Sequence, residues 1–185
     1  MRIPSERIAD DVAEVLYTEE VIQLRVAEIA RQLSRDYAGK NPLLVGVLSG
    51  VVLFIGDLLR HITIPMTLDF MAVSQYTSSQ ASGTVRITKD LDQPITGRHV
   101  IFVEDVIDTG LTLNYLLRTL RARNPASLEV CVLFDRPHRR LIDIPLAYQG
   151  FRLPDQFVVG YGLDISGHYR NLPFVGVLKG NGRAR

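Results

Sequence analysis

Two periodicities of apolar and polar positions divide the chain into alternating elements. Short apolar runs, the pattern of strands buried on both faces, occur at 43–48, 99–103, 128–134 and 157–160. Apolar residues that recur every three or four positions predict helices at 18–33, 51–60 and 111–123. Buried strands that alternate with helices predict an α/β fold, with a mostly parallel sheet flanked by helices.

A polar stretch interrupts this pattern in the middle of the chain. Residues 66–76 and 84–88 are predicted to be extended, and the segment from Thr77 to Gly83 contains only Ser, Thr, Gln, Ala and Gly. Because it has no side chain to anchor it in a core, this segment predicts a mobile loop.

The predicted parallel sheet also indicates where a ligand would bind. Ligands of such sheets bind beyond the carboxyl ends of the strands. We therefore expect a site in the loops that follow Leu48, Val103 and Phe134.

The segment from Val103 to Thr112 is the richest of these places in polar chemistry. The adjacent carboxylates of Glu104 and Asp105 can accept hydrogen bonds from sugar hydroxyls or hold a divalent cation through water. A third carboxylate, Asp108, precedes Thr109-Gly110-Leu111-Thr112, where a glycine and a helix start offer free N–H groups to a phosphate. The combination predicts a sugar-phosphate site.

A simpler explanation of the same segment is that Thr109 caps the helix and the carboxylates are solvated. That explanation does not account for two acids next to an apolar strand and a third in the same turn. No Lys follows Gly110, which excludes the P-loop of nucleoside triphosphate enzymes.

Composition narrows the functional classes further. The 185 residues suit one domain, predicted to span 1–185, and a net charge of +1 gives no field that would attract nucleic acid or a membrane. The apolar run 43–59 is too interrupted to span a bilayer, and no signal peptide is visible. The single cysteine, Cys131, lies in an apolar run, so we expect a buried thiol and a cytoplasmic protein.

The string from Val100 to Thr112 resembles the 5-phosphoribosyl 1-diphosphate binding motif of the type I phosphoribosyltransferases. The resemblance implies the fold of that family, with a core at about 35–160 and a small hood built from the N-terminal segment and about 150–180. It implies that Glu104 and Asp105 bind the ribose and magnesium, and that Asp108 is the catalytic base. The ribose 5-phosphate group is then bound by Asp108, Thr109, Gly110, Leu111 and Thr112.

Further segments resemble the hypoxanthine-guanine branch of that family. Leu48-Ser49-Gly50 matches its diphosphate-binding loop, and Arg170 matches a residue that contacts the diphosphate. Ser74-Gln75-Tyr76 matches the start of its mobile loop, with Gln75 in place of the usual Ser.

The residues that bind the purine, by the same resemblance, lie later in the chain. It implies that Phe157 stacks on the base, that the backbone of Val158 reads the ring edge, and that Asp164 belongs to this pocket and faces a magnesium ion. Arg136 stands where the bacterial pattern usually has a Lys that donates to the exocyclic oxygen of a 6-oxopurine. Arg is longer and forked, so the choice among hypoxanthine, guanine and xanthine stays open.

The sequence therefore predicts a purine-salvage enzyme with magnesium as its cofactor. Its substrates are a 6-oxopurine and 5-phosphoribosyl 1-diphosphate, and the family's dimers and tetramers imply a homodimer or homotetramer. Three alternatives remain: a transferase for xanthine or a pyrimidine, a nucleotide-binding domain without transfer activity, and a regulator that binds RNA. For RNA, the only dense basic cluster is at 136–140.

Overall fold

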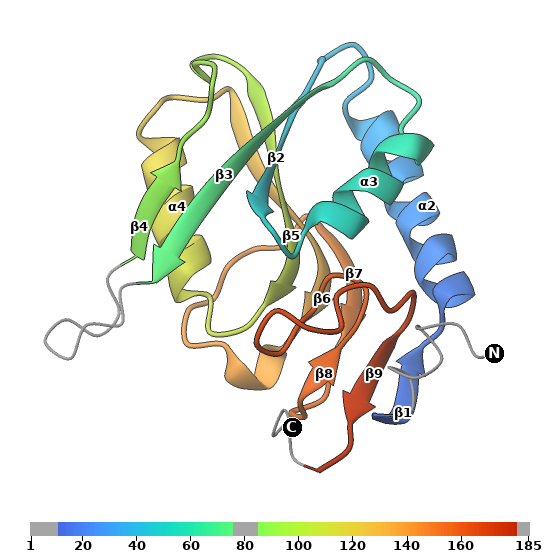
Figure 1. The fold of residues 1–185 in the computed structure, drawn as a ribbon. Coiled ribbons are helices and arrows are strands. Elements are labelled where there is room, and N and C mark those ends of the chain that lie inside the picture. Colours follow the sequence, from blue (N-terminus) through green and yellow to red (C-terminus); the bar gives the residue numbers. More distant parts are fainter. Residues whose placement is uncertain (1–10, 76–84, 181–185) are drawn as a thin grey trace, which may run out of the picture.

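The main sheet of the protein is a six-stranded, mostly parallel one. A computed structural model describes residues 11–75 and 85–180. The strands lie in the order β4-β3-β2-β5-β6-β7 (Figure 1) and are, in chain order, β2 (Leu43–Leu48), β3 (Thr67–Gln75), β4 (Val85–Lys89), β5 (His99–Ile107), β6 (Ser127–Asp135) and β7 (Tyr148–Arg152). All neighbours are parallel except β4, which runs antiparallel to β3 at one edge.

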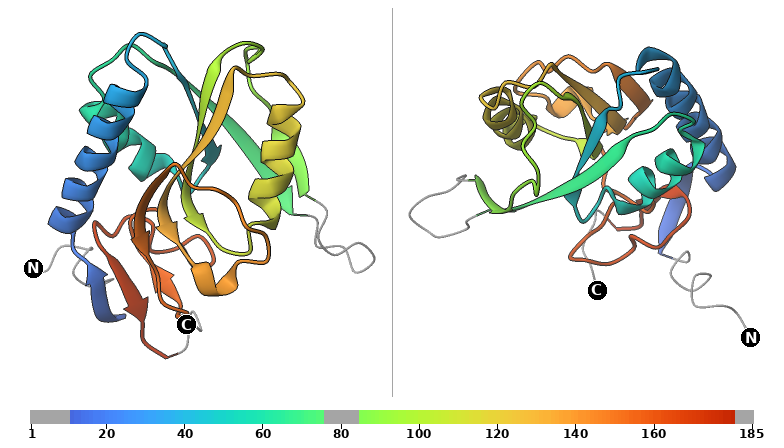
Figure 2. Two further views of the ribbon diagram at one scale, coloured as in Figure 1. Left: turned by 180° about the vertical axis from the view of Figure 1, so that it is seen from behind. Right: turned by 90° about the horizontal axis from the view of Figure 1, so that it is seen from above.

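Helices cover both faces of this sheet. The helices α2 (Glu19–Asp36) and α3 (Val52–His61) lie on one face, and α4 (Leu111–Arg121) lies on the other (Figures 1 and 2). Two buried clusters result, one between the sheet and α2 and α3, the other between the sheet and α4. The predicted α/β class and the buried strands are confirmed.

Local signals in the sequence explain where α2 begins. The Thr18 hydroxyl accepts a hydrogen bond from the N–H of Val21 (3.4 Å), and Glu19 and Glu20 occupy the first turn. These acids complement the positive end of the helix dipole. The buried face comprises Ile22, Val26, Ile29, Ala30 and Leu33.

The two ends of the described chain meet in a second, smaller sheet. Here β1 (Val12–Tyr17), β9 (Val175–Leu178) and β8 (Val158–Val159) are antiparallel, in the order β1-β9-β8. The N–H of Lys179 also donates to the carbonyl of Asp11 (2.9 Å). This sheet is the hood of the expected fold, and it lies below the carboxyl ends of the main strands in Figure 1.

One predicted boundary is wrong and matters for the site. The segment from Asp105 to Gly110 was expected to be a loop, but β5 continues to Ile107. The reason is pairing with β6, in which Val106 lies opposite Phe134 and Ile107 opposite Asp135. Glu104 and Asp105 therefore lie inside a strand, on a rigid support.

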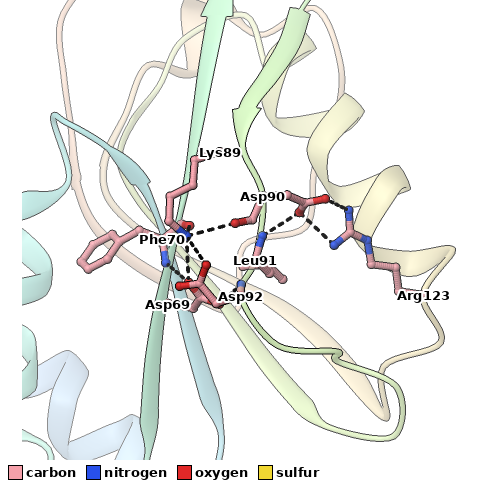
Figure 3. Close-up of polar contacts among 7 residues, drawn as sticks. All are labelled: Asp69, Phe70, Lys89, Asp90, Leu91, Asp92 and Arg123. Carbon is pink, nitrogen blue, oxygen red and sulfur yellow. Dashed lines mark hydrogen bonds and ion pairs between the residues drawn. The ribbon is translucent and has the colours of Figure 1, made fainter.

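A polar cluster fixes the base of the β3–β4 hairpin (Figure 3). The buried carboxylate of Asp69 accepts from the N–H groups of Phe70 (2.7 Å) and Asp92 (2.7 Å) and from the ammonium of Lys89 (3.3 Å). Arg123, beyond α4, holds Asp90 with two hydrogen bonds of 2.9 and 2.7 Å. The cluster ties the edge of the sheet to the segment that leads into β5.

Two expectations from composition can be compared with the structure. Cys131 is a free thiol that is fully buried in β6, and burial raises its pKa, as expected of an inert structural cysteine. Within 11–75 and 85–180, no helix is both long enough and apolar enough to cross a bilayer.

Candidate active site

The paired carboxylates of β5 form the most charged part of the site. Burial raises the pKa of Glu104 well above its ordinary value, and the neighbouring Asp105 adds to the effect. The Glu104 Oε2 atom is buried and has no hydrogen-bond partner. Burial also raises the pKa of Asp105, although N–H groups and Arg170 act in the opposite direction. Glu104 thus lacks compensating positive charge and Asp105 has only that of Arg170, so a cationic ligand would favour the ionised form of both side chains.

The turn between β5 and α4 forms a phosphate-sized cradle. Gly110 begins α4 with a left-handed backbone (φ +81°), and no side chain caps the helix there. Thr109 Oγ1 accepts only a long bond from the N–H of Leu111 (3.4 Å). The free N–H groups face a pocket of about 350 Å³, which is lined by Glu104, Val106, Ile107, Asp108, Thr109, Gly110, Thr112 and Leu113. This geometry favours anion binding over simple capping.

A second pocket of about 190 Å³ adjoins the first. Its lining is Asp105, Val106, Asp108, Arg136, Val158, Leu163 and Asp164. Asp108 lines both pockets, and its Oδ1 atom is buried without a partner. The Nε atom of Arg136 is likewise buried and unpartnered. Unsatisfied polar atoms of this kind are costly in the free protein, so both are placed to bind a polar ligand.

The apolar wall of the second pocket comes from the hood. Val158 is buried in β8, whereas the ring of the adjacent Phe157 is 52% exposed. An aromatic side chain that remains exposed at the edge of a polar pocket can stack on a flat ligand. Phe157 is therefore not a core residue, the assignment that its apolar neighbourhood alone would favour.

Two glycines let three segments meet behind the carboxylates. A Cβ atom on Gly50 would overlap the carboxylate of Asp105, and a Cβ on Gly162 would overlap the carbonyl oxygen of Gly50. Gly162 also has a positive φ (+93°), which favours glycine. The turn Leu48-Ser49-Gly50, which includes a cis peptide bond between Leu48 and Ser49, therefore packs between β5 and the 160–170 segment.

The 160–170 segment places two further charged groups beside this turn. Arg170 donates from Nη1 to the carbonyl of Gly162 (2.6 Å), and its Nη2 lies 2.7 Å from Asp164 Oδ1. Both charges affect the pKa of Asp105, so they lie close to the strand carboxylates. The structure brings Gly50, Asp105, Asp164 and Arg170 close together.

The predicted site residues of the mobile loop lie at or beyond the limit of the described residues. Gln75 ends β3, and Tyr76 and the predicted mobile loop at 77–83 lie outside the described residues. No three His, Cys, Asp or Glu side chains are grouped to hold a metal ion by themselves within the part of the chain that the structure describes.

Sequence reasoning missed the role of Arg139. Its Nε donates to Asp155 Oδ1 (2.7 Å), and its Nη1 lies 3.5 Å from Asp108 Oδ2. Arg140 instead bonds with Asp135 through Nη2 (2.8 Å) and Nε (3.1 Å). Two residues of the basic cluster at 136–140, Arg139 and Arg140, are therefore paired with carboxylates. The only signal in the sequence was the density of Arg itself.

Comparison with known proteins shows the family of the chain. Residues 13–166 match the phosphoribosyl transferase domain family. The chain is 51% identical over 173 residues to a hypoxanthine-guanine phosphoribosyltransferase of Streptococcus agalactiae serotype V, covering 93% of this chain and 96% of that protein.

Solved structures agree with the sequence relatives. A hypoxanthine phosphoribosyltransferase from Staphylococcus aureus superposes with a TM-score of 0.89 at 44% identity, covering 94% of this chain and 95% of that one. A hypoxanthine-guanine-xanthine phosphoribosyltransferase gives 0.83 at 42% identity, with coverages of 92% and 99%. The motif at 100–112, the hood and these matches lead to one conclusion: the chain belongs to the phosphoribosyltransferase family.

Proposed function

We propose that this chain is a purine-salvage transferase. It moves the 5-phosphoribosyl group of 5-phosphoribosyl 1-diphosphate to hypoxanthine and/or guanine, giving IMP or GMP and diphosphate. The observation that carries the proposal is the position of Asp108, whose unpartnered Oδ1 lies where an anion cradle and a second polar pocket adjoin. The names of the relatives support the choice of substrates.

The phosphoribosyl half of the substrate is bound by the β5–α4 turn in this proposal. The N–H groups of Thr109, Gly110, Leu111 and Thr112 and the two Thr hydroxyls bind the 5-phosphate. Glu104 and Asp105 accept hydrogen bonds from the ribose hydroxyls. The turn at 48–50 and Arg170 bind the leaving diphosphate, the first through backbone amides and the second through its guanidinium.

The base is bound and deprotonated in the second pocket. Phe157 stacks on the purine, the Val158 backbone pairs with its ring edge, and Arg136 donates to the 6-oxygen. Asp108 accepts the proton that leaves the imidazole ring as the new bond to ribose forms. A carboxylate held at hydrogen-bond distance can make such a transfer effective.

The donor set also suits magnesium. Glu104, Asp105 and Asp164 offer carboxylate oxygens, which this hard cation prefers, and burial raises the pKa of the first two, so a bound cation would favour their ionised forms. Because the described residues form no ready-made cluster of three ligands, diphosphate oxygens and water would complete the coordination. The ion would neutralise charge on the diphosphate as it leaves.

Particular residues argue against the alternative functions. An RNA-binding surface needs free cations, but Arg139 and Arg140 are paired with carboxylates and Arg136 is half-buried. A binding domain without activity would have no use for the orphaned oxygen of Asp108. Xanthine stays an alternative base, and one structural relative is named for it.

A base panel tests the proposal directly. Initial rates with 5-phosphoribosyl 1-diphosphate and magnesium are measured for hypoxanthine, guanine, xanthine and adenine. We expect turnover with hypoxanthine or guanine and little with adenine, because a cationic donor opposes an amino group. Full activity after removal of divalent metal by a chelator contradicts the magnesium assignment, and RNA binding without turnover contradicts the enzymatic one.

The proposal extends to assembly and location. We infer a homodimer or homotetramer, supported by large apolar side chains on the surface of α2 and α3. We place the enzyme in the cytoplasm, where its phosphorylated substrate is made and where the reduced thiol of Cys131 is stable.

A further inference from the structure

A buried tyrosine joins the 160–170 segment to helix α3. The Tyr161 hydroxyl donates to Asp57 Oδ2 (2.7 Å), and the Gln23 side-chain amide of α2 donates to the same oxygen (2.5 Å). The Tyr161 ring is 3% exposed and packs in the core between the sheet, α2 and α3. Burial, with the adjacent Asp57 carboxylate, raises the pKa of Tyr161, so its hydroxyl stays protonated and donates.

This bond lies at the junction of the two segments assigned to diphosphate. Helix α3 follows directly on the turn at 48–50, and Asp57 lies in its second turn. The next residue after Tyr161 is Gly162, which packs on the carbonyl of Gly50 and exchanges hydrogen bonds with Arg170 in both directions. The position of the Tyr161 ring therefore fixes how Gly162 and Arg170 meet the turn.

The purine side of the same region is anchored by other means. Val158 and Val159 pair with Val177 and Gly176 of β9. These strand bonds hold Val158, the part of the base-pocket wall that β8 contributes, whether or not the tyrosine hydroxyl is present. Leu163 and Asp164 of the 160–170 segment also line this pocket, so the base pocket depends on Tyr161 only on that side.

We propose that Tyr161 and Asp57 are a positioning pair, which holds the 160–170 segment against the turn at 48–50 and so sets the affinity for the diphosphate end of the substrate. Neither side chain touches the reacting atoms. The inference rests on the proposed function, which places the diphosphate between these two segments. Its consequence is unequal, because loss of the bond loosens the diphosphate wall more than the base pocket, whose Val158 side is held by β9.

The test is a comparison of Michaelis constants for the full chain and its Tyr161→Phe variant. We expect KM for 5-phosphoribosyl 1-diphosphate to rise about tenfold, the equivalent of one lost hydrogen bond to a charged group. The KM for the base should stay within about twofold. An unchanged KM for the phosphoribosyl donor, or an equal rise in both constants, overturns the proposal.

Variants at Asp57 test whether the effect passes through this bond. Asp57→Asn keeps an oxygen that can accept from both donors, so it should resemble the wild type, whereas Asp57→Leu should resemble Tyr161→Phe. The double variant Tyr161→Phe/Asp57→Leu should be no worse than the poorer single one, since both remove one interaction. Additive losses overturn the pairing.

A matched control is available at the far end of the sheet. Tyr148 donates to Asp36 Oδ2 (2.8 Å), the same kind of bond between a buried tyrosine and a carboxylate, but at the start of β7. Tyr148→Phe should lower the stability without changing either KM; a matching rise in the donor KM would show a merely structural effect. If the wild type gives no turnover with any base, the proposed function fails first, and the inference fails with it.

Discussion

At the scale of single residues, Asp108 is held through one carboxylate oxygen and leaves the other without a partner. Oδ2 lies 3.5 Å from Arg139, while Oδ1 is buried and unsatisfied. Arg139 is in turn held by Asp155, so the carboxylate has a fixed orientation before substrate arrives. Such preorganisation is what a general base requires.

The Asp108→Asn variant should therefore lose turnover rather than substrate binding. We expect kcat to fall about 10²- to 10⁴-fold, the usual contribution of a positioned base, with small changes in both KM values. Asp143→Asn, at an exposed carboxylate in the loop before β7, serves as the control and should keep full activity. Steady-state kinetics with hypoxanthine measure kcat for both variants. An unchanged kcat for Asp108→Asn would contradict the assignment of Asp108 as the base.

Arg136 determines the preference for the base in the same pocket. Burial lowers the pKa of its guanidinium, and the nearby Asp108 acts in the opposite direction. Replacement by Met removes the charge but keeps much of the length, so kcat/KM for hypoxanthine should fall about 10- to 150-fold, as for a lost charge-assisted hydrogen bond. Arg136→Lys should retain most of the activity.

The discriminating measurement is the ratio of hypoxanthine to adenine activity. That ratio should fall for Arg136→Met and stay unchanged for Arg152→Met, whose arginine is exposed on β7. An equal loss for every base would show that Arg136 only supports the pocket.

At the scale of elements, Gly162 is the point where the hood segment and the turn after β2 touch. Alanine at this position has a left-handed backbone, and its Cβ atom overlaps the Gly50 carbonyl oxygen. Gly167 also has a positive φ (+84°), but nothing lies within 4 Å of the position of its Cβ. A comparison of alanine substitutions at the two positions therefore distinguishes backbone strain from steric overlap.

Gly162→Ala and Gly167→Ala should each cost about 1 kcal/mol or more in stability, since both force alanine into the left-handed region. Only Gly162→Ala should also raise KM for 5-phosphoribosyl 1-diphosphate, by about tenfold or more. Urea unfolding and initial-rate kinetics on both proteins measure the two effects. A rise in KM for Gly167→Ala as well would attribute the effect to strain in the segment instead.

The hairpin base in Figure 3 gives a prediction about pH. Burial by itself would raise the pKa of Asp69, but the N–H groups of Asp92 and Phe70 and the Lys89 ammonium lower it below its ordinary value. A lowered folded-state pKa adds stability that is present above the unfolded pKa and is lost as the pH falls through the folded one.

Asp69→Asn should therefore destabilise the protein at pH 7 by about 1–3 kcal/mol, the cost of disturbing buried hydrogen bonds. The difference from the wild type should shrink as the pH falls below about 4. Asp92→Asn, at an exposed partner of the same lysine, should change stability by less than about 1 kcal/mol. Denaturant titrations between pH 3 and 7 test this, and a difference that does not vary with pH argues against the ionised Asp69.

Periodicity predicted the central strands of the main sheet but missed three other strands. The runs at 43–48, 99–103 and 128–134 became β2, β5 and β6 because both of their faces are covered. The strands β1, β7 and β9 were missed, since Gly or mixed polar residues interrupt them and pairing with distant segments stabilises them. The motif indicated the segment at 103–112, whose roles for Asp108 and the turn after it stay predictions. It gave no sign of Arg139 or Tyr161, whose partners lie far away in sequence.

At the scale of the whole molecule, the surface of α2 and α3 suggests how copies associate. Leu24 is 67% exposed, and Val21, Val52 and Leu53 are also exposed on these adjoining helices. Apolar side chains gathered on the outside of neighbouring elements commonly mark a protein–protein interface.

Light scattering on the purified protein should therefore give a mass two or four times that of the chain. Leu24→Arg should lower this mass by placing an unpaired charge in the interface. Leu141→Arg replaces an equally exposed leucine beyond the short helix at 137–139 and should leave the mass unchanged. A monomeric wild type contradicts the inferred assembly.

The pairing of β1 with β9 has a consequence for the synthesis of the protein. In the order β1-β9-β8, the partner of β1 is β9. Strand β1 therefore cannot pair until β9 has been translated. A product that stops before Val175 would contain the main sheet and the phosphate turn, but β1 and β8 would each lack the strand that joins them. Purine transfer by this chain therefore indicates that translation has passed β9, at Val175–Leu178.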